Sequence, residues 1–100
     1  MIRHIVMFKL KDFSDETAKL NAAQEVVKRL DELPVKISLI RKHKAGIDFR
    51  KLAWSFDIVL TMDFNNLADL EAYTIHPAHQ EFIAFNKDYA VDKVCVDFEM

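Results

Sequence analysis

The sequence predicts an α+β fold, a four-stranded antiparallel sheet with helices on one face. Segments rich in Ile, Val and Phe alternate with amphipathic segments in the order strand, helix, strand, strand, helix, strand, which is a split βαβ arrangement. The length of 100 residues suits one domain, which we place at residues 1–100. The first strand is apolar on both of its faces, so both faces of the sheet need a cover.

Residues 2–11, IRHIVMFKLK, form the first predicted strand. Alternation places His4 and Val6 on one face, and Ile5 and Met7 on the other. Helices on a single face of the sheet leave the second face open. A second copy of the same sheet, related by a two-fold axis, is the simplest cover. We therefore expect a homodimer.

The first helix is expected over residues 14–32. Ser14 is the expected N-cap, and two acids follow it in the first turn, where the helix dipole favours negative charge. Pro34 comes just after the expected end. Apolar residues recur at helical spacing through this segment: Leu20, Ala23, Val26, Val27, Leu30 and Leu33.

The second half of the chain is expected to supply three strands and a helical region. These are a strand over residues 35–45 with a break at Gly46, a strand over 53–64, a short helix capped by Asn65 and Asn66, a helical piece beginning at Pro77, and a last strand over 91–100. In the last strand, Val94, Val96, Phe98 and Met100 share one side.

Charge and composition narrow the function classes. The net charge of −2 gives no reason to expect nucleic acid or a membrane surface as a partner. A basic run over residues 36–51 reads as an exposed edge strand, with an anion-binding patch as the alternative. Cys95 lies between two valines and is expected to be a small buried side chain. As the single cysteine of the chain it cannot form an internal disulfide, which is typical of a protein in a reducing compartment. With no signal peptide or membrane span in the sequence, we expect a cytoplasmic protein.

The segment EAYTIHPAHQEF, residues 71–82, gathers the groups best suited to chemistry. Pro77 fits the first turn of a helix, and it makes His76 extended, as an N-cap residue must be. His79 then lies in the first turn, where the positive end of the dipole lowers its pKa and leaves a neutral ring. Such a ring is a candidate base, and Tyr73 is a candidate to orient a substrate oxygen or to bond His79.

Each candidate also has an ordinary structural interpretation. His76 is a candidate for substrate binding or only a helix cap, and His79 for a base or a structural hydrogen bond. His4 would line a pocket or be satisfied locally, and Phe82 would contact substrate or only the core. We expect no metal, because carboxylates at ligand spacing are missing near these histidines, and no cofactor.

Four segments resemble the stress-responsive dimeric α+β barrel family: MIRHIVMFKLKDFSDE, SFDIVLTMDF, DLEAYTIHPAHQEF and VCVDFEM. The resemblance extends from Ile2 to Glu99. It implies a ferredoxin-like subunit whose sheet packs on its twin to form a barrel around an apolar pocket. In the Y-x-x-H-P-x-H element, Tyr73 and His79 match residues used by the plant polyketide cyclases of the family, and His4 matches a pocket residue of theirs.

Three functional hypotheses follow. The first is a protein that binds a small apolar or carbonyl-containing molecule in the barrel. The second is a cofactor-independent enzyme, similar to the polyketide cyclases or to the monooxygenases of sister barrels, with His79 as base and Tyr73 as its partner. The third is a structural or interaction module without a site. A cavity beside Tyr73 and His79 would favour the first two, and a filled interior would favour the third.

Overall fold

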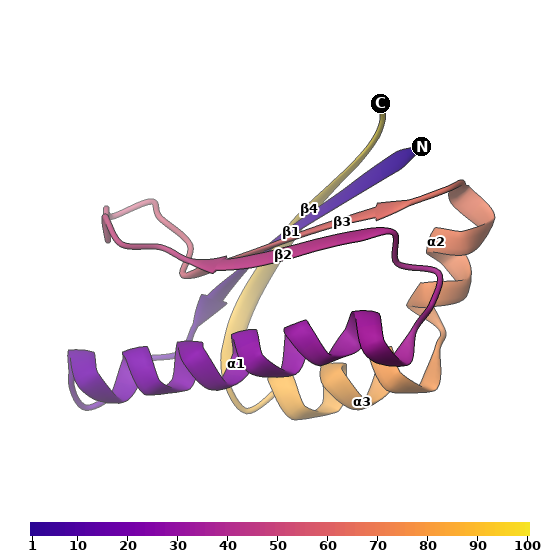
Figure 1. Cartoon of the computed structure of the whole chain (residues 1–100). Coiled ribbons are helices and arrows are strands. Elements are labelled where there is room, and N and C mark those ends of the chain that lie inside the picture. The colour runs from indigo at the N-terminus through magenta and orange to yellow at the C-terminus, as the bar shows by residue number, and fades with distance from the viewer.

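A computed structural model describes residues 1–100 and has the predicted class of fold (Figure 1). The elements in chain order are β1 (Ile2–Leu10), α1 (Glu16–Lys36), β2 (Lys42–Ile47), β3 (Ile58–Phe64), α2 (Leu67–Thr74), α3 (Pro77–Asn86) and β4 (Ala90–Glu99). The four strands form one sheet in the order β2-β3-β1-β4, and every neighbouring pair is antiparallel. The predicted ferredoxin-like α+β fold is therefore confirmed.

The helices lie on one side of the sheet, and the two chain termini lie close together at one end of it (Figure 1). Strand β1 is central, and its register sets which residues share a face. Val6 stands opposite Leu60 of β3 and Cys95 of β4, so these three side chains point to the helix side. Their neighbours in sequence point to the other side.

The hydrophobic core lies between the sheet and the helices. Val26 and Leu30 of α1 are completely buried against it, as are Met62 and Phe64 of β3. Removing this much apolar surface from water is the main favourable term for a chain of this size, at about 25 cal/mol per Å². The core positions the cavity described below, because Val6, Phe8, Leu60 and Phe82 belong to both.

Helix α1 begins and ends later than expected. Asp15, not Ser14, is the N-cap, and its carboxylate accepts a hydrogen bond from the Ala18 amide at 2.7 Å. The helix runs through Pro34 to Lys36, although proline lacks the amide that an interior position needs. Leu33 and Ile37 are almost fully buried on either side of Pro34, and this burial outweighs the one lost hydrogen bond.

The second strand is correspondingly shorter and later than expected. Residues 35–41 complete α1 and a turn, and β2 covers only Lys42–Ile47. Gly46 lies inside β2 opposite Val59 and does not break it. The expectation of a basic edge strand over residues 36–51 is confirmed in part. Strand β2 is an edge of the sheet with Lys42 and Lys44 exposed on it, whereas Lys36 ends α1 and Arg50 and Lys51 lie in the following loop.

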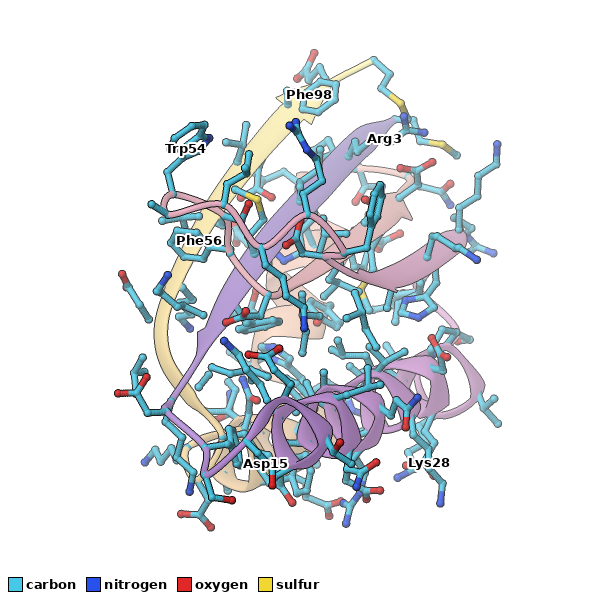
Figure 2. The ribbon with its side chains drawn as sticks, turned by 90° about the vertical axis from the view of Figure 1, so that its left-hand side faces the viewer. Arg3, Asp15, Lys28, Trp54, Phe56 and Phe98 are labelled. Atoms are coloured by element: carbon cyan, nitrogen blue, oxygen red, sulfur yellow. The ribbon has the colours of Figure 1, made fainter.

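The side of the sheet away from the helices is uncovered, and we call it the bare face. It presents a set of apolar side chains from three strands: Ile5, Met7, Val59, Val94, Val96 and Phe98. Figure 2 shows Phe98 and Arg3 on this side together with Trp54 and Phe56 from the β2–β3 loop, all away from α1. Val96 is 60 % exposed and Trp54 is 78 % exposed. An exposed apolar surface of this kind marks an interaction site.

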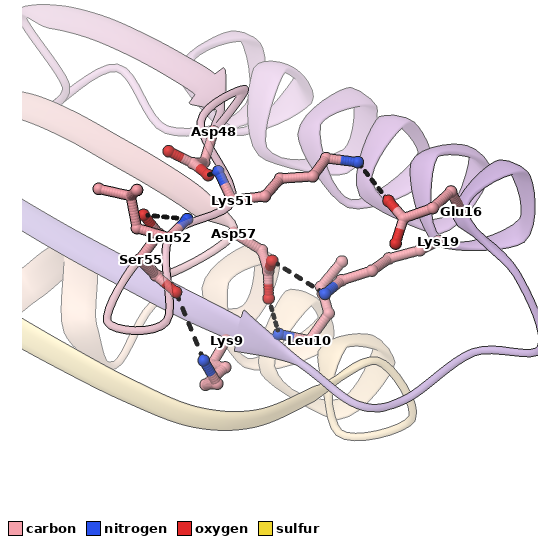
Figure 3. A network of polar contacts seen from close by, with 9 residues as sticks. All are labelled: Lys9, Leu10, Glu16, Lys19, Asp48, Lys51, Leu52, Ser55 and Asp57. Carbon is pink, nitrogen blue, oxygen red and sulfur yellow. Dashed lines mark hydrogen bonds and ion pairs between the residues drawn. The ribbon is translucent and has the colours of Figure 1, made fainter.

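The loop between β2 and β3 is held in place by Asp57 and Lys51 (Figure 3). The Asp57 carboxylate accepts the Leu10 amide at 2.7 Å and pairs with the Lys19 ammonium at 3.1 Å. Lys51 has a left-handed backbone with φ of 55° and pairs with Glu16 of α1, which raises the pKa of Lys51 and lowers that of Glu16. These bonds tie the loop to the start of α1 and so fix its aromatic residues at the rim of the bare face.

None of the helices is both long enough and apolar enough to cross a membrane.

Candidate functional site

A cavity of about 700 Å³ opens between α3 and the helix side of β1 and β4. Its floor is formed by His4, Val6 and Phe8 of β1, and one wall by residues of β4 between Ala90 and Asp97. The opposite wall comes from successive turns of α3, beginning at His79. A volume of this size is typical of a small-molecule site.

The cavity exists because the helices do not cover β4. Helix α1 packs on β2 and β3 at the far edge of the sheet, and β4 remains exposed along almost its whole length. Cys95, expected to be buried, is therefore exposed, and it lines the cavity. The expectation failed because burial of an edge strand depends on helix placement, which the local sequence does not reveal.

The cavity lies within one chain and on the helix side of the sheet. The family resemblance implied a pocket inside a barrel formed by two sheets, which is the side of the bare face. His4, Tyr73 and His79 all line the helix-side cavity instead. That expected location is wrong for these three residues, although the structure brings them together as the sequence suggested.

His79 is oriented by the backbone at the end of α2. Its Nδ1 lies 2.9 Å from the Thr74 carbonyl oxygen. Because a carbonyl can only accept, Nδ1 carries the hydrogen and Nε2 keeps its lone pair. Burial lowers the pKa of His79, a decrease that the Thr74 bond opposes and the nearby Lys93 supports. The predicted direction is confirmed, but burial is the largest cause, where the sequence pointed to the helix dipole.

Tyr73 is a buried partner of His79 through ring contact. The two ring centroids are 4.4 Å apart at an interplanar angle of 34°. Burial raises the pKa of Tyr73, so its hydroxyl stays protonated and able to donate a hydrogen bond. The sequence left open a hydrogen bond between Tyr73 and His79, and the structure shows this tilted ring contact in its place.

His4 completes this end of the cavity and has a partner that the sequence did not reveal. Its ring centroid lies 6.0 Å from that of Tyr73, with the rings near perpendicular. Its Nδ1 is hydrogen-bonded to the carboxylate of Asp97, directly across on β4. A His-carboxylate pair fixes the orientation of the ring. Asp97 was missed, although alternation opposite the exposed valines of β4 places it on the helix side.

His76 and Phe82 serve the fold itself to a greater extent than His79 does. His76 is the N-cap of α3, and its Nδ1 accepts the Ala78 amide at 3.0 Å, as one of the two interpretations predicted. It does not line the cavity. Phe82 lines the cavity and is also part of the core, against Phe8, so both of its interpretations hold.

No three His, Cys, Asp or Glu side chains come together in an arrangement that would hold a metal ion. His4, His76 and His79 are instead each bonded to a different group.

A second, polar hollow of about 570 Å³ lies on the bare face beside β2. Arg3 bonds Asp63 there through two nitrogens at 2.8 and 3.0 Å, and these hydrogen bonds lower the pKa of Asp63. Lys42 and Lys44 line the same hollow. The ion pair with Arg3 explains how the Asp63 carboxylate can be almost completely buried. The alternative interpretation of the basic run, an anion-binding patch, stays a prediction.

The comparison with known proteins identifies a family and several relatives. The model for the stress responsive A/B barrel domain matches residues 2–100. A stress-response A/B barrel domain-containing protein of Arabidopsis thaliana is 29 % identical over 101 residues, which are 98 % of this chain and 46 % of that protein. The chain thus spans about half the length of this curated relative.

Solved structures agree with this assignment. A dimeric protein of unknown function with a ferredoxin-like fold from Bacteroides fragilis is 32 % identical, with a TM-score of 0.86 over 99 % of this chain and 95 % of that one. A hydroxynitrile lyase from Passiflora edulis shares the fold at 17 % identity, with a TM-score of 0.81 over 99 % of this chain and 92 % of the lyase.

Proposed function

The chain belongs to the stress-responsive A/B barrel domain family, and from the geometry of its cavity we propose that it binds a small, largely apolar carbonyl compound there. One observation carries the proposal: three hydrogen-bonding rings, His4, Tyr73 and His79, meet at one end of a cavity whose middle is apolar. A small-molecule site is usually an apolar pocket into which a small number of polar groups point.

We further propose that His79 removes a proton from the carbon next to the ligand carbonyl. Its Nε2 has a lone pair, and its lowered pKa keeps the ring neutral at pH 7. The C–H bond breaks, the proton goes to Nε2, and the electron pair moves onto the carbonyl oxygen as an enolate. The Tyr73 hydroxyl, kept protonated by burial, donates to that oxygen and stabilises the charge.

Two further facts support an enzyme of this kind. The Passiflora hydroxynitrile lyase has the same fold, so the fold is compatible with catalysis. The resemblance of the Y-x-x-H-P-x-H element to the polyketide cyclases also agrees with chemistry next to a carbonyl. A structural module without a site is disfavoured, because the space beside Tyr73 and His79 is not filled by side chains.

The test uses 2-acetylnaphthalene, an apolar ketone with exchangeable methyl protons. In D₂O, NMR measures both its binding and the rate at which these protons exchange for deuterium. The wild type is expected to accelerate exchange, and His79→Gln to lose roughly 100-fold of that acceleration or more while still binding the ketone. The control His76→Asn keeps an N-cap at α3 and is expected to exchange at the wild-type rate.

The outcomes separate the two parts of the proposal. Binding with exchange that His79→Gln does not slow would contradict the role of His79 as base. The absence of binding by wild-type protein would contradict the carbonyl-binding site itself.

We also propose that the bare face packs on a second copy of the chain. Its apolar side chains from β1, β3 and β4 are exposed in the single chain, and the related Bacteroides fragilis protein is described as dimeric. A two-fold interface would cover this face in both copies at once.

A further inference from the structure

Asn86 is a buried polar residue at the other end of the cavity. It lies in the last turn of α3, is 7 % exposed, and lines the cavity. Its Oδ1 is sealed from solvent and has no hydrogen-bond partner in the protein. An unpaired buried amide is destabilising, so such a group in a native structure points to a ligand or to a functional role.

The spacing along α3 relates Asn86 to His79. Seven residues separate them, which is about two turns and roughly 10 Å along the helix, so both face the same side. Between them, Phe82 and Ile83 present apolar surface to the cavity. The wall of the cavity therefore has a polar group at each end and an apolar middle.

The charged residues that line the cavity balance one another. They are two lysines, Lys87 and Lys93, and two aspartates, Asp92 and Asp97. A lining with equal numbers of both signs favours neither an anion nor a cation as ligand. A neutral ligand with polar groups at its ends fits this lining best.

We propose that Asn86 binds a hydroxyl group of the ligand, so that the cavity selects an uncharged hydroxy-carbonyl compound with about 10 Å between its two polar ends. This inference rests on the proposed function, because the carbonyl end is the one held by His79 and Tyr73. A hydroxyl both donates and accepts, and the carboxamide turns over about its last torsion. Turning the Asn86 carboxamide brings its oxygen, which is sealed in the free protein, to the cavity side, where it accepts a hydrogen bond from the ligand hydroxyl.

Two fluorescent ketones test the inference. 2-Acetyl-6-hydroxynaphthalene has a carbonyl at one end of two fused rings and a hydroxyl at the other, and 2-acetylnaphthalene lacks only the hydroxyl. Wild-type protein is expected to bind the hydroxylated ketone roughly three- to ten-fold more tightly, as one hydrogen bond between neutral groups allows. Asn86→Leu, similar in volume and without the amide, is expected to remove that preference.

Ile83→Ala is the matched control from the apolar middle of the cavity. It is expected to weaken both ketones by the same factor and to keep the preference for the hydroxyl. The melting temperature of Asn86→Leu without ligand is a second readout, and it is expected to be no lower than that of the wild type, because an unpaired amide is replaced by an apolar group.

Three results would overturn the inference. Equal binding of the two ketones by the wild type contradicts the role of Asn86 and leaves the proposed function intact. A markedly lower melting temperature for Asn86→Leu shows that the protein itself uses the amide. Failure of the wild type to bind either ketone contradicts the proposed function, and the inference with it.

Discussion

The two faces of the sheet differ in how polar and apolar groups are arranged. On the helix side, the cavity has a polar end formed by His4, Tyr73 and His79, and each histidine there has a fixed partner. On the bare face, valines and aromatic residues such as Val96 and Phe98 are exposed without any cover from the same chain. One strand, β4, contributes to both faces through alternate residues.

We propose that the two faces of the sheet serve separate functions, ligand binding on the helix side and association on the bare face. Groups held in fixed orientations inside a cavity suit chemistry, whereas a broad apolar surface suits association with another protein surface. A substitution on one face of β4 should therefore affect association and leave ligand binding unchanged, and a substitution one residue away should do the reverse.

The largest effect is expected for Val96→Glu on the bare face. In a two-fold interface this change places two like charges in an apolar contact, and the dimer should weaken roughly 100-fold or more. Sedimentation velocity over a concentration series measures this change. Cys95→Ser, the neighbouring residue on the cavity side, is the control and should leave association unchanged. Equal association of Val96→Glu and wild type would show that the bare face is not the interface.

The next largest effect is the pH dependence of proton exchange from 2-acetylnaphthalene. Only the neutral ring of His79 accepts a proton, so the rate should fall about tenfold per pH unit below its pKa. Because burial lowers that pKa below its ordinary value of 6.5, the midpoint should lie below pH 6.5. A midpoint above 6.5, measured from rates at several pH values, would contradict a buried neutral base.

The same shift has a consequence for stability with a defined sign. The folded state disfavours protonated His79, so its contribution is fully present above pH 6.5 and is lost as the pH falls through the lower folded pKa. His79→Gln should therefore lose less stability on acidification than the wild type does, as thermal melts at matched pH values would reveal.

A smaller effect is expected for Asp97→Asn at the polar end of the cavity. The change weakens the bond that orients His4 across β1 and β4. Exchange should slow by several-fold, up to about tenfold, and the free energy of unfolding should fall by about 1 kcal/mol, because the pair is partly open to solvent. Exchange kinetics and urea unfolding measure the two effects. An unchanged rate would limit Asp97 to a structural role.

The smallest effect is expected at His76, which caps α3 beside the cavity without lining it. His76→Ala should cost about 1 kcal/mol of stability, and His76→Asn should restore the cap. Neither should change ketone affinity. Loss of affinity in His76→Asn, measured by fluorescence titration, would place His76 in the ligand site after all.

Local chemistry made part of the molecule predictable. Pro77 and His76 specify the start of α3 through effects confined to adjacent residues, and alternation specified both faces of β1. The lowered pKa of His79 was also predicted in direction. These features depend on residues close in sequence, so they can be read from it.

Features that depend on long-range packing were not predictable. Helix α1 continues through Pro34 because Leu33 and Ile37 are buried by distant parts of the chain. The pairing of His4 with Asp97 joins residues at opposite ends of the sequence through the β1–β4 register. Asn86 could not be predicted as a ligand-binding residue, because a single Asn in a helix does not indicate a binding site until its burial and its unpaired oxygen are known.

We propose that the ligand binds on the helix side of the sheet and not on the bare face. Methyl NMR during titration with 2-acetylnaphthalene tests it most directly, because valines and isoleucines report on both faces. We predict shifts at Val6 and Ile83, which line the cavity, and none at Val59 or Val96 of the bare face, which do not. Shifts confined to Val59 and Val96 would place the ligand on the bare face and contradict binding in the helix-side cavity.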